Sequence, residues 1–115
     1  MDTRELKLRA RTPKQFVDLN SVAIGTIATV WKPKGDATIL FMGGYISVDV
    51  ACSVLFEDNR AGKNRFVFRT PVLVPNTPHA FGLSNGIYLS DVRNALKATG
   101  SVPASITGTL YGREE

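Results

Sequence analysis

Apolar and polar side chains alternate along one long stretch of this chain. Between Ile46 and Phe56 every second residue is apolar, and the residues between them are mostly small or polar. A period of two is that of an extended strand with one face buried and the other in water. The stretch therefore predicts a half-buried β-strand, bent near Asp49.

Strand-like segments recur along the rest of the chain, separated by turns rich in glycine, proline and charged residues. Residues 57–64 are predicted as a polar hairpin loop, and residues 71–86 as a long irregular connection. About seven or eight short strands, with no persuasive amphipathic helix, predict an all-β fold: an antiparallel β-sandwich or jelly roll. The clearest further strands are Val22 to Trp31, Ala37 to Val48, Arg65 to Arg69 and Ala104 to Gly112.

One segment is apolar at consecutive positions rather than alternate ones. A strand of this kind is covered on both faces, either by an opposing sheet and an arm or by a neighbouring subunit. Gly43 and Gly44 follow it and predict a bulge. We expect five residues to belong to the core or to a subunit interface: Trp31, Ile39, Leu40, Phe41 and Met42.

Positive charge is concentrated at the start of the chain. Five lysines and arginines fall within the first fifteen residues, although the formal net charge of the whole chain is only +4. We therefore divide the chain into a basic, extended N-terminal arm at residues 1–20 and a β-sandwich domain at residues 21–115. Thr12 and Pro13 interrupt the arm, because proline cannot donate to a strand ladder.

Three roles are open for this arm: a solvated tail, a nucleic-acid-binding segment and a docking segment for another protein. Lysine and arginine can neutralise phosphates, but no aromatic side chains that could stack on bases are interleaved with them. Leucines alternate with the charges, which equips the arm to add a strand to another sheet. We favour docking onto protein, through Arg4, Leu6, Lys7, Leu8, Arg9 and Arg11.

Residues suited to catalysis or metal binding are sparse. Cys52 is the one cysteine and His79 the one histidine, and neither has a second soft ligand at a recognisable spacing. We expect no catalytic site, no metal and no cofactor, and therefore no enzyme activity. The charged start, Met1 to Glu5, does not look like a secretory signal, and no apolar run could span a membrane.

Four stretches carry a family resemblance: Val30-Trp31-Lys32-Pro33, Gly43-Gly44-Tyr45-Ile46-Ser47, Val54-Leu55-Phe56-Glu57-Asp58 and the ending from Thr107 to Glu115. Together they resemble small β-sandwich accessory proteins of tailed bacteriophages, the kind that decorate capsids or form spikes and fibres. The resemblance covers about residues 22–115 and leaves out the basic arm. None of the four stretches carries chemistry, so the resemblance bears on fold and setting.

The resemblance implies a capsid decoration or cement protein. Such a protein is a virion structural protein, synthesised in the cytoplasm of the bacterial host, that binds the major capsid protein on the outer surface of the shell. It also implies a homo-oligomer, specifically a trimer. On this hypothesis the arm residues make the capsid contacts, and decoration stabilises the shell by burying surface across capsomer junctions.

Other functions stay open at this point. A tail-tip, fibre or spike component would recognise a host surface through residues 71–86, with His79, Phe81 and Tyr88 as candidate contacts. A nucleic-acid-binding β-barrel would retain DNA in a salt-sensitive way. A degenerate cupin-like enzyme or small-ligand binder would carry a metal or a ligand through purification.

Overall fold

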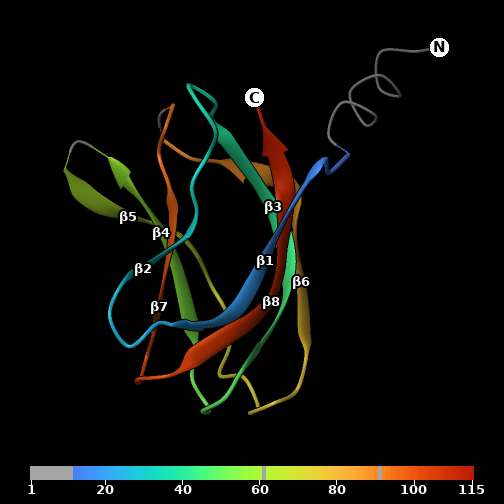
Figure 1. Cartoon of the computed structure of the whole chain (residues 1–115), viewed down its shortest axis with the longest axis vertical. Helices are drawn as coiled ribbons and strands as arrows, with labels where there is room; N and C mark the ends of the chain where they lie inside the picture. Colours follow the sequence, from blue (N-terminus) through green and yellow to red (C-terminus); the bar gives the residue numbers. More distant parts are fainter. Residues whose placement is uncertain (1–11, 61, 91) are drawn as a thin grey trace.

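The computed structural model describes residues 12–60, 62–90 and 92–115, and these contain eight β-strands and no helix (Figure 1). No helix in this part of the chain is long and apolar enough to cross a membrane. The strands are β1 (Gln15–Ala23), β2 (Ala28–Trp31), β3 (Ile39–Val48), β4 (Val54–Arg60), β5 (Lys63–Arg69), β6 (His79–Tyr88), β7 (Leu96–Gly100) and β8 (Ser105–Glu114).

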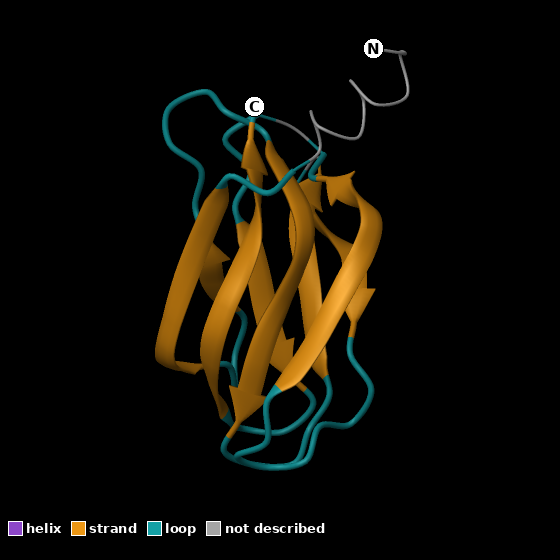
Figure 2. Cartoon of the chain, turned by 90° about the vertical axis from the view of Figure 1, so that its right-hand side faces the viewer, coloured by secondary structure: helices purple, strands orange, loops and turns teal. Residues whose placement is uncertain are grey.

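The strands form two four-stranded sheets, and every pairing within them is antiparallel. The first sheet has the order β1-β8-β3-β6, and the second has the order β2-β7-β4-β5. The two sheets pack face to face (Figure 2). The prediction of an all-β fold made of antiparallel strands is therefore confirmed.

Aromatic rings from both sheets meet in the core between them. Phe41 and Phe81 belong to the first sheet, and Phe56 and Phe68 belong to the second. The Phe41 and Phe56 ring centroids are 5.3 Å apart, and those of Phe68 and Phe81 are 5.0 Å apart. At these separations aromatic pairs contribute attraction beyond simple burial of area, so this cluster holds the sheets together.

The apolar segment of β3 is buried on both faces of its sheet. Ile39 and Phe41 face the shared core, whereas Leu40 is 0% exposed and Met42 8% exposed without belonging to that cluster. Gly86 of β6 lies against both, since a Cβ placed there would be 2.8 Å from Leu40 Cδ1 and 3.1 Å from Met42 Cγ. Side chains buried this deeply within one chain have little surface left to offer a second copy.

The predicted bulge at the glycine pair is confirmed. The register of β3 shifts between Phe41 and Gly43 against both of its neighbours, β6 and β8. Gly43 has a φ of 153°, which residues with a side chain rarely adopt. A Cβ there would lie 2.5 Å from the Tyr111 hydroxyl oxygen and closer still to the Phe81 carbonyl oxygen. Position 43 therefore requires glycine, because of its φ angle and because the Tyr111 ring lies against it.

Two predicted segment boundaries are wrong. The stretch from Ile46 to Phe56 is not one bent strand, because β3 ends at Val48 and β4 begins at Val54 in the other sheet. The chain turns at Asp49, whose carboxylate accepts a 2.7 Å hydrogen bond from the Ser105 amide. The alternation persists through the turn because Cys52, although outside both strands, is 1% exposed and pairs with Leu73.

Residues 57–64 are also not a polar loop. β4 continues to Arg60 and β5 starts at Lys63, which leaves a two-residue connection. The polar residues are paired across the hairpin, with Asp58 opposite Arg65 and Asn59 opposite Asn64. The polar residues of this segment therefore form pairs across two strands and do not form a loop. The predicted irregular connection is likewise shorter, since β6 begins at His79.

The first strand begins earlier than predicted. β1 starts at Gln15 and pairs with β8 along its length, so residues 15–20 of the expected arm belong to the first sheet. The segment predicted as one strand from Val22 to Trp31 is divided between β1 and β2, with residues 24–27 connecting the two sheets. Gly25 lies within this connection.

Replacing Gly43 with alanine should destabilise the protein strongly. The added methyl group meets the Phe81 carbonyl and the Tyr111 ring, and the φ angle is unfavourable. We expect a loss of about 2–4 kcal/mol in the free energy of unfolding, measured by urea denaturation. Gly82, opposite Gly43 on β6, is the matched control, since the nearest atom to a Cβ there is 3.9 Å away. Equal losses for Gly43→Ala and Gly82→Ala would contradict this account.

Candidate interaction surfaces

The strand order places the loops at two ends of the sandwich, and the two ends differ chemically. One end, at the top of Figure 1, holds both ends of the described chain and the connections β2–β3, β4–β5 and β6–β7. The other end holds the connections β1–β2, β3–β4, β5–β6 and β7–β8. We call them the charged end and the apolar loop end.

The charged end is held together by side chains from distant parts of the sequence. The Glu114 carboxylate accepts hydrogen bonds from Trp31 Nε1 at 3.0 Å and from the Lys34 amide at 2.8 Å. Glu115 exchanges two backbone hydrogen bonds with Thr38. The C-terminal Gly-Arg-Glu-Glu run is therefore part of the fold at this end.

A buried ion pair lies at the same end. The Asp58 carboxylate is 0% exposed and accepts two 3.0 Å hydrogen bonds from the Arg65 guanidinium, one to each oxygen. It also accepts a 2.6 Å bond from the Ser90 amide. Burial raises the pKa of Asp58, but the hydrogen bonds from Arg65 and Ser90 outweigh it, so the pKa lies below its ordinary value. This carboxylate ties the β4–β5 hairpin to the β6–β7 connection.

That position corrects one sequence-based interpretation. The sequence placed Asp58 in a polar hairpin loop, but this residue is buried and lies inside β4. Asp36 is exposed and pairs with Arg93, as a turn residue does. The opposite charge at Arg65, seven residues away across a hairpin, was the signal that could have identified the buried pair.

The six predicted arm contacts, Arg4, Leu6, Lys7, Leu8, Arg9 and Arg11, lie outside the described residues. The structure does describe the point that the arm leads into. Lys14 donates its amide to the Gly112 carbonyl at 2.8 Å, and Gln15 accepts a bond from the Glu114 amide at 2.9 Å. The chain therefore enters the sandwich at the charged end.

The apolar loop end consists of residues 24–27, 49–53, 70–78 and 101–104. Asp49 is the only Asp, Glu, Lys, Arg or His in these four loops. Of the ten large apolar or aromatic side chains that are exposed among the described residues, five lie here. They are Ile27, Val50, Val72, Val74 and Val102, with exposures between 40% and 71%.

The loops of this end are bonded to one another through their backbones. The Ile24 amide donates to Ala104, the Leu73 amide to Cys52 and the Asn76 amide to Val48. Ile24, Cys52 and Leu73 also point into the core, at 0%, 1% and 4% exposure. The exposed side chains therefore belong to loops that are held in place by backbone hydrogen bonds and by buried side chains of the same loops.

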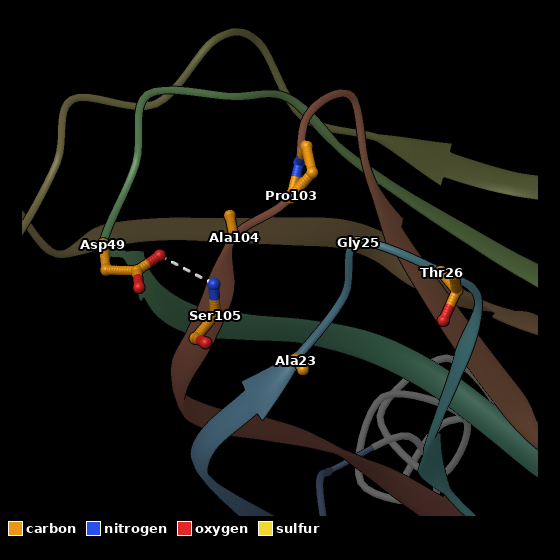
Figure 3. A pocket seen from close by; sticks show the side chains of 7 residues that line it. All are labelled: Ala23, Gly25, Thr26, Asp49, Pro103, Ala104 and Ser105. Carbon is orange, nitrogen blue, oxygen red and sulfur yellow. Dashed lines mark hydrogen bonds between the residues drawn. The ribbon is translucent and has the colours of Figure 1, made fainter.

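A shallow hollow opens beside these loops (Figure 3). Its walls are small side chains, and the Asp49 carboxylate at one side is engaged by the Ser105 amide. Asp49 is thus already hydrogen-bonded within the chain. The lining residues are Ala23, Gly25, Thr26, Asp49, Pro103, Ala104 and Ser105.

The residues considered for chemistry or recognition do not form a cluster. The Cys52 thiol is buried, and burial followed by the nearby Asp49 charge raises its pKa. His79 stacks on Phe81 at 6.4 Å, and Phe81 is only 9% exposed, so it is not available as a host-surface contact. Tyr88 lies at the opposite end of β6 from His79. Within residues 12–60, 62–90 and 92–115, no three His, Cys, Asp or Glu residues are placed to share a metal ion.

Sequence reasoning named residues 71–86 as a candidate recognition segment, but it did not group this segment with the other loops of the apolar loop end. Its signal was present in the run Pro71-Val72-Leu73-Val74-Pro75, where apolar residues sit in a proline-bounded connection without any charge. Such a run is too short to identify as exposed from sequence alone, because its middle residue, Leu73, is buried while Val72 and Val74 are not.

Comparison with protein-family models, with curated proteins and with solved structures finds no match to this chain.

Replacing Asp58 with asparagine should destabilise the protein at neutral pH. The change leaves the Arg65 guanidinium without its anion, and we expect a loss of about 2 kcal/mol in the free energy of unfolding at pH 7. Asp36→Asn is the matched control, since both members of that ion pair are more than 70% exposed. Its loss should stay under about 0.5 kcal/mol.

The same pair predicts a pH dependence. A carboxyl group whose pKa is lowered by folding stabilises the native state above its unfolded pKa, here 3.8. That contribution is lost as the pH falls through the lower folded pKa. The difference in stability between the native chain and Asp58→Asn should therefore be constant from about pH 7 to pH 5 and shrink below pH 4. A difference that grows on acidification would refute the assignment.

Proposed function

We propose that this chain is a virion structural protein that decorates the outer surface of a bacteriophage capsid and stabilises the shell. The observation that carries the proposal is the apolar loop end, where uncharged loops expose Ile27, Val50, Val72, Val74 and Val102. Apolar side chains gathered on uncharged loops at one end of a molecule favour a contact with another protein.

We also propose that the sandwich is a jelly roll. The pairing of strands supports this: first with last (β1–β8), then β2–β7, β3–β6 and β4–β5, alternately in the two sheets. This is the arrangement of a long antiparallel hairpin that is rolled up, so that its successive strand pairs alternate between two sheets. Jelly rolls occur in viral capsid proteins, lectins and cupins, so the fold agrees with the proposal without selecting it.

The proposed attachment to the shell uses the basic arm. Its six candidate residues, Arg4 to Arg11, precede a chain that enters the sandwich at the charged end, away from the apolar loops. An arm and a rigid body can bind two different neighbours at once. Each copy then bridges major capsid protein subunits, and modest contacts repeated over the shell add up to resistance against rupture.

The resemblance to decoration, spike and fibre proteins of tailed phages supplies the setting for this proposal: the virion as location, and a trimeric homo-oligomer as assembly. Support for the tail-tip, fibre or spike alternative is weaker. Its candidate contacts His79, Phe81 and Tyr88 do not share one exposed surface, because Phe81 is buried and the other two lie at opposite ends of β6.

Deletion of residues 1–11 should abolish binding to capsids and leave the sandwich folded. The deletion stops short of Lys14 and β1, so it removes no hydrogen bond described for the sheet. We expect the full chain to co-sediment with shells of the encoding phage that lack this protein, and the deletion variant to stay in the supernatant. Circular dichroism and thermal unfolding of both proteins serve as the folding control.

A charge variant makes the test specific to the arm. Changing Arg4, Lys7, Arg9 and Arg11 to glutamine keeps the length of the arm and removes its charge. Binding should fall about tenfold or more. Full binding by both arm variants would exclude the arm as the attachment, and absence of binding by the native chain would overturn the proposed function.

A further inference from the structure

We propose that Asn85 is a site of spontaneous covalent modification. The backbone nitrogen of Gly86 attacks the side-chain amide of Asn85, which is converted to aspartate or isoaspartate, and the isoaspartate form loosens β6. The chain contains six asparagines, and Asn85 is the one that is followed by glycine. This inference is independent of the proposed function, because the reaction needs no partner.

Water is the only co-reactant of this reaction. The Gly86 nitrogen forms a bond to Cγ of Asn85, the bond from Cγ to the side-chain nitrogen breaks, and ammonia leaves with the proton of the attacking nitrogen. The product is a five-membered succinimide ring, which water then opens at one of its two carbonyl groups. Opening at the backbone carbonyl gives isoaspartate, and opening at the former side-chain carbonyl gives aspartate.

The backbone around Asn85 departs from a regular strand. β6 is an edge strand of the first sheet (Figure 1). Residues 83–86 all lie opposite the single residue Met42, between the pairs Phe41–Ile87 and Gly43–Gly82. A bulge of this kind interrupts the ladder of hydrogen bonds, so its backbone reaches the geometry of attack at a lower cost than a paired strand does. Asn85 is also exposed, which gives water access to the ring.

The fold itself requires the glycine that makes Asn85 reactive. Gly86 has a φ of 85°, which residues with a side chain rarely adopt. A Cβ at this position would lie 2.8 Å from Leu40 Cδ1 and 3.1 Å from Met42 Cγ. The packing that excludes a side chain at position 86 therefore also removes the steric hindrance that would slow attack by its nitrogen.

Asn20 is a matched comparison within the same chain. It is exposed and lies at a bulge of β1, where the register shifts between Leu19 and Val22. The residue that follows it is Ser21, whose amide donates a 3.1 Å hydrogen bond to the Thr107 hydroxyl oxygen. The nitrogen that would attack Asn20 is therefore hindered by a side chain and already engaged, so Asn20 should react more slowly than Asn85.

The isoaspartate product should weaken the contact between β6 and β3. Isoaspartate lengthens the backbone by one methylene group and adds a negative charge. The lengthened backbone lies directly before Gly86, which covers Leu40 and Met42, and these side chains are only 0% and 8% exposed. Aspartate adds the charge at an exposed position and leaves the backbone length unchanged, so this product should have little effect on stability.

The test is incubation of the full chain in neutral to mildly alkaline buffer, followed by mass spectrometry and peptide mapping. We expect a gain of about 1 Da at Asn85, formed about tenfold or more faster than at Asn20. The rate should rise with pH, because the attacking nitrogen must lose its proton. Asn85→Gln should prevent the gain, since its ring would need six members.

Three results would overturn the site. The first is an unchanged Asn85 in the folded chain under conditions in which the urea-unfolded chain reacts. The second is an equal rate at Asn20 and Asn85. The third is an undiminished mass gain in Asn85→Gln.

Urea denaturation tests the structural consequence. Ion exchange separates the modified chains by charge, and peptide mapping identifies the isoaspartate form. We expect this form to unfold at a lower urea concentration than the native chain, and Asn85→Asp to unfold at the native midpoint. Equal midpoints for all three proteins would overturn the loosening of β6, and an equally low midpoint for Asn85→Asp would assign the effect to the charge instead of the longer backbone.

Discussion

The burial of one aromatic cluster between two sheets constrains the rest of this molecule. Phe41 and Phe81 from one sheet and Phe56 and Phe68 from the other pack at centroid separations between 5.0 and 6.5 Å. Because most successive strands lie in opposite sheets, most connections must cross between layers at an end of the sandwich. The strand order around this cluster therefore places the loops at the two ends of the sandwich, and with them the charged end and the apolar loop end.

The two ends that result are stabilised in different ways. At the charged end, polar side chains are satisfied within the chain: Glu114 by Trp31 and Lys34, and Asp58 by Arg65 and Ser90. At the apolar loop end the backbone is satisfied by bonds between loops, and the side chains are left in water. A surface whose polar groups are paired and whose apolar groups are not favours contact with another apolar surface.

Local patterns predicted strands well and predicted connections poorly. The glycine pair after Met42 predicted a bulge, and the register shift between Phe41 and Gly43 confirms it. Period-two alternation, by contrast, reports which side chains are buried and not whether the chain turns between them. Cys52 is buried in a turn, so the alternation from Ile46 to Phe56 looked like one strand. Likewise, the polar residues Asp58 and Arg65 made their segment look like a loop. They lie in strands because they pair with each other across a hairpin.

The sequence by itself determined the all-β class, the approximate number of strands and the core character of the residues from Ile39 to Met42, because these depend on side-chain period and local backbone preference. The tertiary structure decided which strands are neighbours, which end each loop occupies and which valines remain in water. Those features depend on contacts between residues as distant as Gln15 and Gly112. No local pattern encodes such contacts, since they exist only when both sheets have closed over the same core.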